Sequence, residues 1–168
     1  MGMDVSGRRP ASEKGEYFRA SVWSWHPLWD YCEELEPELC DSVRSPHTND
    51  GDGLKARDAK LLGIAILAAV GDGRAAKYIA AQEKKVAKMP DKKCDLCAGT
   101  GRRAVVPKSG AGPHGCNGCG GDYGNPPEDM GKAGTGKVRP FETNYSFDLD
   151  HLREFGEFCC ASGGFRIW

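Results

Sequence analysis

The clearest hydrophobic pattern in the chain covers residues 54–70. From Leu61 onward this stretch is apolar on nearly every side of a helix, so it predicts a buried central helix. The run Gly71-Asp72-Gly73 ends it. Apolar residues then recur at helical spacing over 74–88, between outward-facing lysines. We therefore expect a second helix there and an antiparallel helix hairpin.

Shorter patterns predict three further helices. Pro27 suits the first turn of one helix, and another short helix is expected over about 37–44. Ser146 or Asp148 can cap a last helix, which we expect to dock back on the first. The first and last of these helices have apolar faces made of Leu28, Tyr31, Cys32 and Leu35, and of Leu149, Leu152, Phe155 and Cys159.

Eight cysteines fall in three groups, and only the middle group has the spacing of a metal site. Cys94 and Cys97 are separated by eighteen residues from Cys116 and Cys119. Two C-x2-C pairs at this distance are typical of a tetrahedral zinc site closed by four thiolates. A closed shell leaves no position for a substrate water, so one Zn²⁺ is expected as a structural cofactor. A redox-active C-x2-C pair and disulfides without a metal are the alternatives.

The remaining cysteines are expected to be reduced. Cys32, Cys40 and Cys159 lie on apolar faces, where free cysteine behaves as a small hydrophobe. The adjacent Cys159 and Cys160 would pair only through a strained ring, although with a histidine they are an alternative second metal site. His114, close before the second C-x2-C pair, is an alternative ligand in place of one thiolate.

The residues after each C-x2-C pair make the zinc prediction more specific, because they form a repeated motif. The segment Cys94-Asp95-Leu96-Cys97-Ala98-Gly99-Thr100-Gly101-Arg102 has the form C-x2-C-x-G-x-G. The second copy begins at Cys116, and its Thr-Gly-basic ending returns only at Thr135-Gly136-Lys137, as if residues 122–134 were inserted. Residues 94–137 thus resemble a two-repeat version of the zinc motif of DnaJ-type co-chaperones, which implies one zinc hairpin. The His-Pro-Asp triplet of a J-domain does not occur, so chaperone function does not carry over.

A second resemblance spans most of the chain. It rests on five segments, namely Tyr17-Phe18-Arg19, the aromatic stretch 23–32, the turn 49–54, the C-x2-C pairs and Ala161-Ser162-Gly163-Gly164-Phe165. In this order they look like a family of small uncharacterised proteins of bacteriophages and prophages. That resemblance implies no activity or catalytic residue. It implies a binding role, because small phage accessory proteins often bind a host protein.

These patterns together predict a mostly α fold, a small α+β arrangement with an inserted zinc hairpin. Residues 1–14 are polar without periodicity and are expected to form a flexible leader. Residues 15–168 are expected to form a single compact domain. The segment 92–140 holds more than half of the 23 glycines, with eight basic and four acidic residues, and is expected to be an insertion in that domain.

Charge and hydropathy restrict the function classes. With 23 Lys+Arg against 24 Asp+Glu, the net charge of −1 argues against general polyanion binding by the whole chain. The longest apolar run, 61–70, is about half of the roughly 20 residues that a bilayer span needs, and no apolar signal core begins the sequence. We therefore expect a soluble, cytoplasmic protein without a membrane partner.

Two groups of residues suggest a binding surface. One, the basic fringe of the zinc hairpin, can contact nucleic-acid phosphates or an acidic protein. It consists of Lys92, Lys93, Arg102, Arg103, Lys108, Lys132, Lys137 and Arg139. The other, the aromatic segment, anchors a protein partner if exposed and otherwise forms the core. It consists of Phe18, Trp23, Trp25 and Trp29.

No Ser/His/Asp, P-loop or paired-carboxylate pattern occurs, so no catalytic residue is predicted. The favoured hypothesis is a zinc-containing, phage-encoded binding protein that engages, and can inhibit, a host macromolecule such as a defence protein in the bacterial cytoplasm. A nucleic-acid-binding zinc protein that uses the basic fringe is the main alternative. An enzyme or small-molecule binder of unrecognised type is the third hypothesis.

Overall fold

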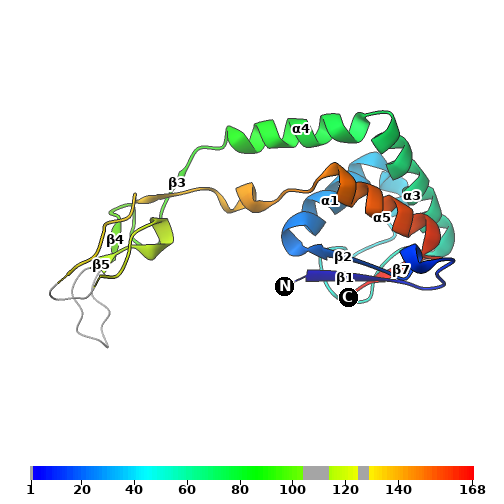
Figure 1. Ribbon diagram of the computed structural model, residues 1–168, viewed down its shortest axis with the longest axis horizontal. Helices are drawn as coiled ribbons and strands as arrows, with labels where there is room; N and C mark the ends of the chain where they lie inside the picture. The colour runs from blue at the N-terminus through cyan, green and yellow to red at the C-terminus, as the bar shows by residue number, and fades with distance from the viewer. Residues whose placement is uncertain (1, 104–113, 125–128) are drawn as a thin grey trace. The chain divides into compact units, whose positions relative to one another are not determined.

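The computed structural model describes residues 2–103, 114–124 and 129–168 (Figure 1). The chain divides into two compact units, Met1–Val86 with Asn144–Trp168, and Ala87–Thr143. The second unit is therefore inserted in the sequence of the first, and the segment expected at 92–140 falls within it. The described residues contain five α-helices and three small antiparallel sheets, in line with an α-rich α+β fold.

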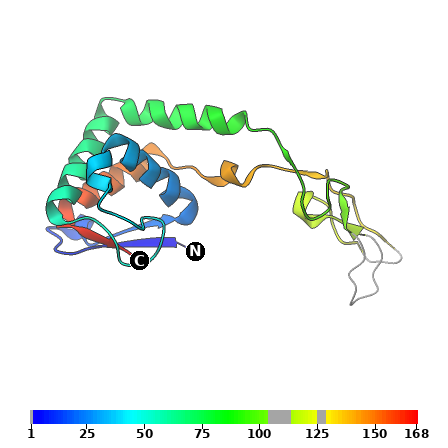
Figure 2. The same ribbon diagram turned by 180° about the vertical axis from the view of Figure 1, so that it is seen from behind.

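The first unit contains a three-stranded antiparallel sheet in the order β2-β1-β7. These strands are β1 (Gly2–Gly7), β2 (Tyr17–Ser21) and β7 (Phe165–Ile167). Val5 of the central strand pairs with Phe18 on one side and with Ile167 on the other, and all three side chains are buried. Figures 1 and 2 show the sheet lying against the helices from both directions.

The expectation of a flexible leader over residues 1–14 is wrong for residues 2–7, which form the central strand of this sheet. Met3 and Val5 alternate with partly exposed residues and are buried. Two apolar positions are too few to mark a strand in the sequence. The strand is stabilised by partners at residues 17–21 and 165–167, and one of these lies at the far end of the chain.

The helices of the first unit are α1 (Val22–Leu35), α2 (Pro37–Cys40), α3 (Ala56–Gly71), α4 (Arg74–Ala87) and α5 (Leu149–Ala161). The structure confirms Asp148 as the N-cap of α5, since its carboxylate accepts a hydrogen bond from the His151 N–H at 2.8 Å. The first helix begins earlier than predicted, because Ser21 caps it six residues before Pro27. Pro27 has no N–H, so the Trp23 carbonyl instead accepts a hydrogen bond from the Ser146 N–H at 3.2 Å.

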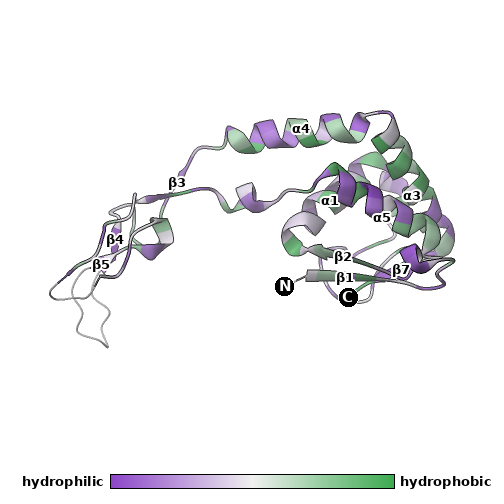
Figure 3. Ribbon diagram, in the orientation of Figure 1, coloured by the Kyte–Doolittle hydropathy of each residue, from purple (hydrophilic) through white to green (hydrophobic). Residues whose placement is uncertain are grey.

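The predicted hairpin of α3 with α4 does not form, because α3 packs along α5 instead. Two glycines allow this close approach. A Cβ on Gly63 would lie 2.6 Å from the Gly156 carbonyl oxygen, and a Cβ on Gly156 would lie 2.9 Å from Ile66. Helix α3 is largely apolar (Figure 3), whereas in α4 only Ala75 is buried. The core around α3 and α5 contains Trp25, Trp29, Leu62, Ile66, Phe155, Phe158 and Phe165.

The second unit is built from short elements. Its strands are β3 (Lys92–Lys93), β4 (Arg102–Arg103), β5 (His114–Gly115) and β6 (Lys137–Val138), and its 3₁₀ helices are η2 (Asn117–Cys119) and η3 (Phe141–Asn144), the last of which ends at the unit boundary. Strand β3 pairs with β6 and β4 pairs with β5, both antiparallel. Among the described residues of the whole chain, no helix is both long and apolar enough to cross a membrane.

Candidate metal centre

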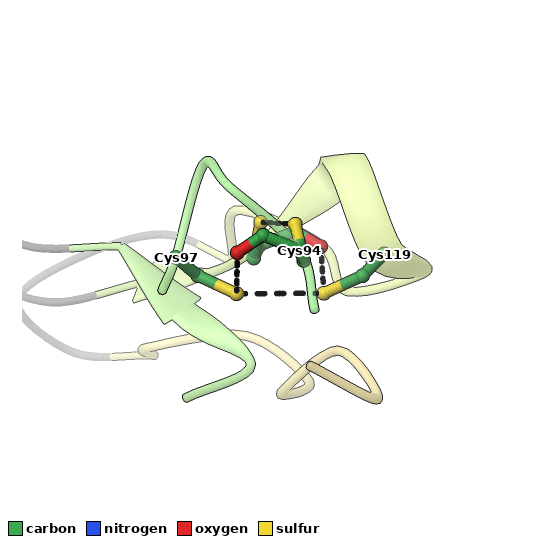
Figure 4. Close-up of side chains that lie close together, drawn as sticks. Cys94, Cys97 and Cys119 are labelled. Carbon is green, nitrogen blue, oxygen red and sulfur yellow. Dashed lines mark hydrogen bonds between the residues drawn. The ribbon is translucent and has the colours of Figure 1, made fainter. Parts of the chain in front are cut away.

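The structure brings together the four cysteines that the sequence spacing singles out. Cys94 follows β3, Cys116 follows β5, and all four side chains are at most 6% exposed. The Sγ atoms of Cys94 and Cys116 lie 3.8 Å apart, as do those of Cys97 and Cys119 (Figure 4). All four sulfur atoms lie within 4.8 Å of one another, so this cluster can hold a metal ion.

The sulfur positions fit one tetrahedral ion. Metal–sulfur bonds of about 2.3 Å place neighbouring sulfurs of a tetrahedron about 3.8 Å apart, which matches both short pairs. The eight cysteines all lie in the described residues and are free, so the disulfide alternative is not what the structure contains. A four-thiolate set is the donor chemistry of closed structural zinc sites.

The pKa values of the clustered cysteines indicate that four thiolates there need a compensating cation. Burial opposes ionisation of Cys97, but the backbone N–H of Gly101 and the thiol of Cys94 outweigh it and lower the pKa of Cys97 to about 7. Burial and the neighbouring thiols raise the pKa of Cys119 to about 12, despite the backbone N–H of Gly136. Four sulfurs so close together cannot all be thiolates unless a positive ion compensates their charge.

The two cysteine pairs are surrounded by equivalent hydrogen bonds. The Gly101 N–H donates to the Cys97 sulfur and the Gly136 N–H to the Cys119 sulfur, each at 3.3 Å. The Cys94 N–H donates to the Gly136 carbonyl and the Cys116 N–H to the Gly101 carbonyl, each at 2.9 Å. Each repeat therefore holds the ligand backbone of the other, and both present N–H groups to the sulfurs.

One threonine in each repeat has the same hydrogen-bond partners, and this match shows which residues end the second repeat. The Thr100 hydroxyl donates to the carbonyls of Cys97 and Arg102, at 2.7 and 2.8 Å. The Thr135 hydroxyl donates in the same way to the carbonyls of Cys119 and Lys137, at 3.3 and 2.9 Å. Thr135-Gly136-Lys137 thus occupies the place in the second repeat that Thr100-Gly101-Arg102 occupies in the first.

The segment 122–134 separates the two parts of the second repeat, and its described ends lie side by side. The Asp122 N–H donates to the Lys132 carbonyl at 3.1 Å, and the Asp122 carboxylate accepts from the Lys132 N–H at 2.9 Å. The chain therefore returns to the metal cluster next to where it left. Residues 125–128 of this segment lie outside the described residues.

The alternative ligands do not join the cluster. Of the described His, Cys, Asp and Glu residues, only the four cysteines bring their ligand atoms together. His114 is buried beside the Tyr123 ring, at a centroid distance of 4.4 Å, and its Nδ1 lies 3.0 Å from the Gly115 carbonyl oxygen. Cys159 is buried in the core of the first unit, where burial raises its pKa well above the usual value, and Cys160 is partly exposed beside it.

Of the two interpretations of the aromatic segment, the core holds for Trp25 and Trp29, because both are fully buried and so cannot anchor a partner. Trp25 stacks on Trp29 at a centroid distance of 5.6 Å and contacts Phe155 edge-on. The two tryptophans are part of the core of the first unit, which also contains Leu28 and Leu62. Trp23 is 37% exposed and lies beside Tyr145, with ring centroids 5.4 Å apart.

Several members of the basic fringe already have partners within the second unit. Arg102 donates to the carbonyls of Met130 and Gly131, and Arg103 donates to the Tyr123 hydroxyl. Lys92 forms an ion pair with Glu142 at 3.2 Å, and Arg139 forms one with Asp91 at 3.7 Å. Lys93 and Lys137 are exposed and directly opposite each other in the β3–β6 pair, whereas Lys108 lies outside the described residues.

An enzyme needs a pocket for its substrate, and a pocket among the described residues is a candidate for this role. It has a volume of about 330 Å³, is open to solvent and lies in the first unit. Its lining residues are Ser24, Glu83, Ser146, Phe147, Asp148 and His151. Asp148 is occupied as the cap of α5, the hydroxyls of Ser21 and Ser24 lie 3.0 Å apart, and the His151 Nε2 makes no hydrogen bond to any described residue. No hydrogen-bonded serine–histidine pair is therefore found among these lining residues.

The structure brings together two histidines to which the sequence assigned no role. His26 of α1 and His47 of the loop after α2 lie with ring centroids 4.2 Å apart. Burial, and then the nearby His47, lower the pKa of His26. Twenty-one positions separate the two residues, so no local motif could have identified the pair.

The metal cluster is thus defined by its own geometry and by the internal repeat around it. No protein-family model matches this chain, and searches of curated proteins and of solved structures find no match either.

Proposed function

We propose that the unit Ala87–Thr143 is a structural zinc module and that the protein is a binding protein whose zinc module presents a surface to another macromolecule. The observation that carries this proposal is the cluster of four buried cysteines with sulfur–sulfur distances of 3.8 Å. Cys94, Cys97, Cys116 and Cys119 would be the ligands. Zinc bound there would supply folding energy, because four thiolates leave no position for a reacting water.

The packing of the second unit supports a structural role for the ion. Among its described residues, the buried apolar cluster consists of the four cysteines, with Val138 partly buried against them. So small a cluster cannot offset the conformational entropy of ordering this many residues. A metal that closes the loops would therefore stand in for a hydrophobic core.

We further propose a protein as the partner, in keeping with the resemblance to uncharacterised phage proteins, since small phage accessory proteins often bind a host protein. Several large apolar side chains of the second unit are exposed, among them Leu96 at 57% and Met130 at 47%. Residues 87–143 hold nine basic and six acidic residues. Four thiolates around one divalent ion would add two negative charges, which leaves little net positive charge to attract a polyanion.

Elemental analysis of the purified, reduced protein tests the zinc proposal. We expect one equivalent of zinc per chain, and a large loss of zinc in Cys97→Ser with little change in Cys160→Ser, the matched control outside the cluster. Less than about half an equivalent of any metal in the reduced wild-type protein would contradict the proposal.

A pull-down from nuclease-treated bacterial lysate tests the partner. We expect a protein in about equal amount that is lost with the double variant Leu96→Ser and Met130→Ser. Leu61→Ser is the matched control, because Leu61 is 40% exposed in the first unit. Equal capture by both variants, with zinc content unchanged, would rule out this surface.

Nucleic-acid binding is the second candidate, and one observation favours it. Lys93 and Lys137 face each other across β3–β6, an arrangement of like charges that costs stability unless an anion lies between them. A polyanion partner predicts affinity that falls steeply with salt and is weakened by Lys93→Ala with Lys137→Ala. It also predicts weaker binding by Arg102→Ala with Arg103→Ala. Unchanged binding of both double variants to DNA and RNA would remove this candidate.

A further inference from the structure

The histidine pair of the first unit lies next to a carboxylate. His26 and Asp30 are one turn apart on α1, and His47 faces them from the loop after α2. The Asp30 Oδ1 lies 3.6 Å from the His47 Nε2. Two imidazoles and a carboxylate from distant parts of the chain therefore meet at one place on the surface.

The loop that carries His47 is held in position by hydrogen bonds on both sides. The Trp25 indole N–H donates to the Pro46 carbonyl at 2.7 Å, which ties the residue before His47 to α1. The Asp52 carboxylate accepts from the backbone N–H groups of Arg44 and Ser45, at 2.7 and 3.0 Å. The two imidazoles are thus placed against each other by the fold itself.

One ring nitrogen of the pair has no partner. Within the described part of the chain, the Nδ1 of His47 is buried and makes no hydrogen bond, so the ring is incompletely satisfied. The atom of His47 that faces Asp30 is the other ring nitrogen, Nε2, which is therefore the candidate ligand. The ring of Tyr145 stacks beside His26 at a centroid distance of 5.4 Å and supplies an apolar wall on that side.

We propose that His26, His47 and Asp30 form a second metal site, for a divalent transition-metal ion of the Zn²⁺, Co²⁺ and Ni²⁺ class. Imidazole and carboxylate are ligands that suit these ions. Two ligands on a tetrahedral ion with bonds of about 2.0–2.1 Å lie about 3.4 Å apart, close to the observed Asp30–His47 separation. This site is separate from the cysteine cluster and stands without it.

Binding requires a small movement of side chains. Among the described residues, only the four cysteines bring all their ligand atoms within 4.8 Å of one another, so the proposed ligands must rotate to converge. The Asp30 side chain is 60% exposed and free to turn. Three protein ligands leave coordination positions for water, so the ion is expected to be held more weakly than in a closed thiolate site and to exchange readily.

Titration of the zinc-loaded full chain with Ni²⁺ tests this site, because a closed cysteine cluster that already holds zinc takes up no second ion. After excess metal is removed by dialysis, isothermal titration calorimetry of the wild type should show one further equivalent bound. We expect at least about a tenfold loss of affinity in His47→Ala and in His26→Gln, since even outer-shell partners of a metal are worth 10–100-fold. Asp41→Asn, an exposed carboxylate outside the cluster, should bind as the wild type does.

A cobalt titration of the metal-free, reduced protein separates the two sites. Thiolate ligands give intense charge-transfer absorption, so the first equivalent of Co²⁺ should produce it and the second should not. No further equivalent in the wild type, or equal binding by both histidine variants with unchanged thermal unfolding, would overturn the proposal. Absence of the charge-transfer bands alone would instead count against the cysteine site.

Discussion

At the scale of single residues, the metal cluster depends on glycines with left-handed backbone. Gly101 has φ +73° and its N–H donates to the Cys97 sulfur. A Cβ at this position would lie 2.2 Å from the carbonyl oxygen of Gly134, in the other repeat. Gly136 has the equivalent relation to the carbonyl oxygen of Gly99, also at 2.2 Å. Only glycine therefore fits at these two positions, because a Cβ would clash with the backbone of the other repeat.

Gly101→Ala is expected to weaken zinc binding by about 10–100-fold, the loss typical when support of a metal ligand is removed. The clash would push apart the two repeats and draw the N–H away from the sulfur. Competition against a chromophoric zinc chelator measures the change. Gly120→Ala is the matched control, because Gly120 has φ +83° and nothing within 4 Å of the added Cβ. Equal losses in both variants would mean that backbone strain, not the clash, limits the site.

Asp52 is a residue of the first unit whose charge stabilises a loop. Burial raises its pKa, but hydrogen bonds from the backbone N–H groups of Ser45, Gly53 and Arg44 outweigh this and lower the pKa below the ordinary value of 3.8. A lowered pKa means that the ionised form is favoured by folding. Its contribution to stability is therefore present above the ordinary value and is lost as pH falls through the folded value.

Asp52→Ala is expected to lower the free energy of unfolding at pH 7 by about 1–2 kcal/mol, because backbone N–H groups lose a charged acceptor. Urea denaturation of wild type and variant at pH 7 and near pH 3 measures the difference, which should shrink on acidification. The exposed Asp41 provides the control, since Asp41→Ala should change little at either pH. A difference that grows at low pH would contradict the assigned role.

At the scale of elements, the contact between α3 and α5 determines the packing of the first unit. It depends on Gly63 and Gly156, which let the two helix backbones approach. Glycine inside a helix normally lowers stability relative to alanine, by about 0.5–1 kcal/mol. Here the close packing of α3 against α5 offsets that cost, and α4 is displaced from the position that a simple hairpin would give it.

Gly63→Ala is expected to destabilise the first unit by about 1–3 kcal/mol, although alanine is the better helix former. The added Cβ would meet the Gly156 carbonyl oxygen at 2.6 Å and the Cys160 sulfur at 2.7 Å. Thermal or urea unfolding followed by tryptophan fluorescence measures the loss. Gly71→Ala, at the end of the same helix with nothing within 4 Å, should be neutral or slightly stabilising. A stabilised Gly63→Ala variant would refute this account of the contact.

At the scale of the whole molecule, the two units differ in what holds them together. The first has an aromatic core with several fully buried side chains, among them Trp25, Trp29 and Phe155. In the described part of the second unit, the buried apolar cluster is four cysteines with Val138 beside them. The stability of the second unit should therefore depend on the metal, whereas that of the first unit should not.

Removal of zinc with a strong chelator is expected to unfold residues 87–143 and to leave the first unit folded. All four tryptophans, Trp23, Trp25, Trp29 and Trp168, belong to the first unit, so their emission should stay unchanged. Amide NMR signals of the second unit should collapse toward unfolded positions and return when zinc is restored. A shift in tryptophan emission, or an unchanged spectrum of the second unit, would each contradict this division.

Features encoded within a few residues were determined by the sequence alone. The two C-x2-C pairs predicted which cysteines converge, and the Thr-Gly-basic ending at 135–137 was recognised despite the intervening segment. Asp148 was one of the two cap candidates for the last helix, and the helices at 54–70 and 74–88 were placed within two residues of α3 and α4 at all four ends. Ligand spacing, capping and helical period are local properties, so they can be read without knowing what packs against them.

Only the tertiary structure decided which distant segments meet. Residues 2–7 became a central strand because residues 17–21 and 165–167 pair with them. Trp25 and Trp29 became core because Phe155 of α5 and Phe165 of β7 pack against them. The meeting of His26 with His47 depends on a loop tied to α1 through Pro46. Strand pairing and side-chain contact are relations between segments far apart in the chain, and the local pattern of one segment carries no record of its partner.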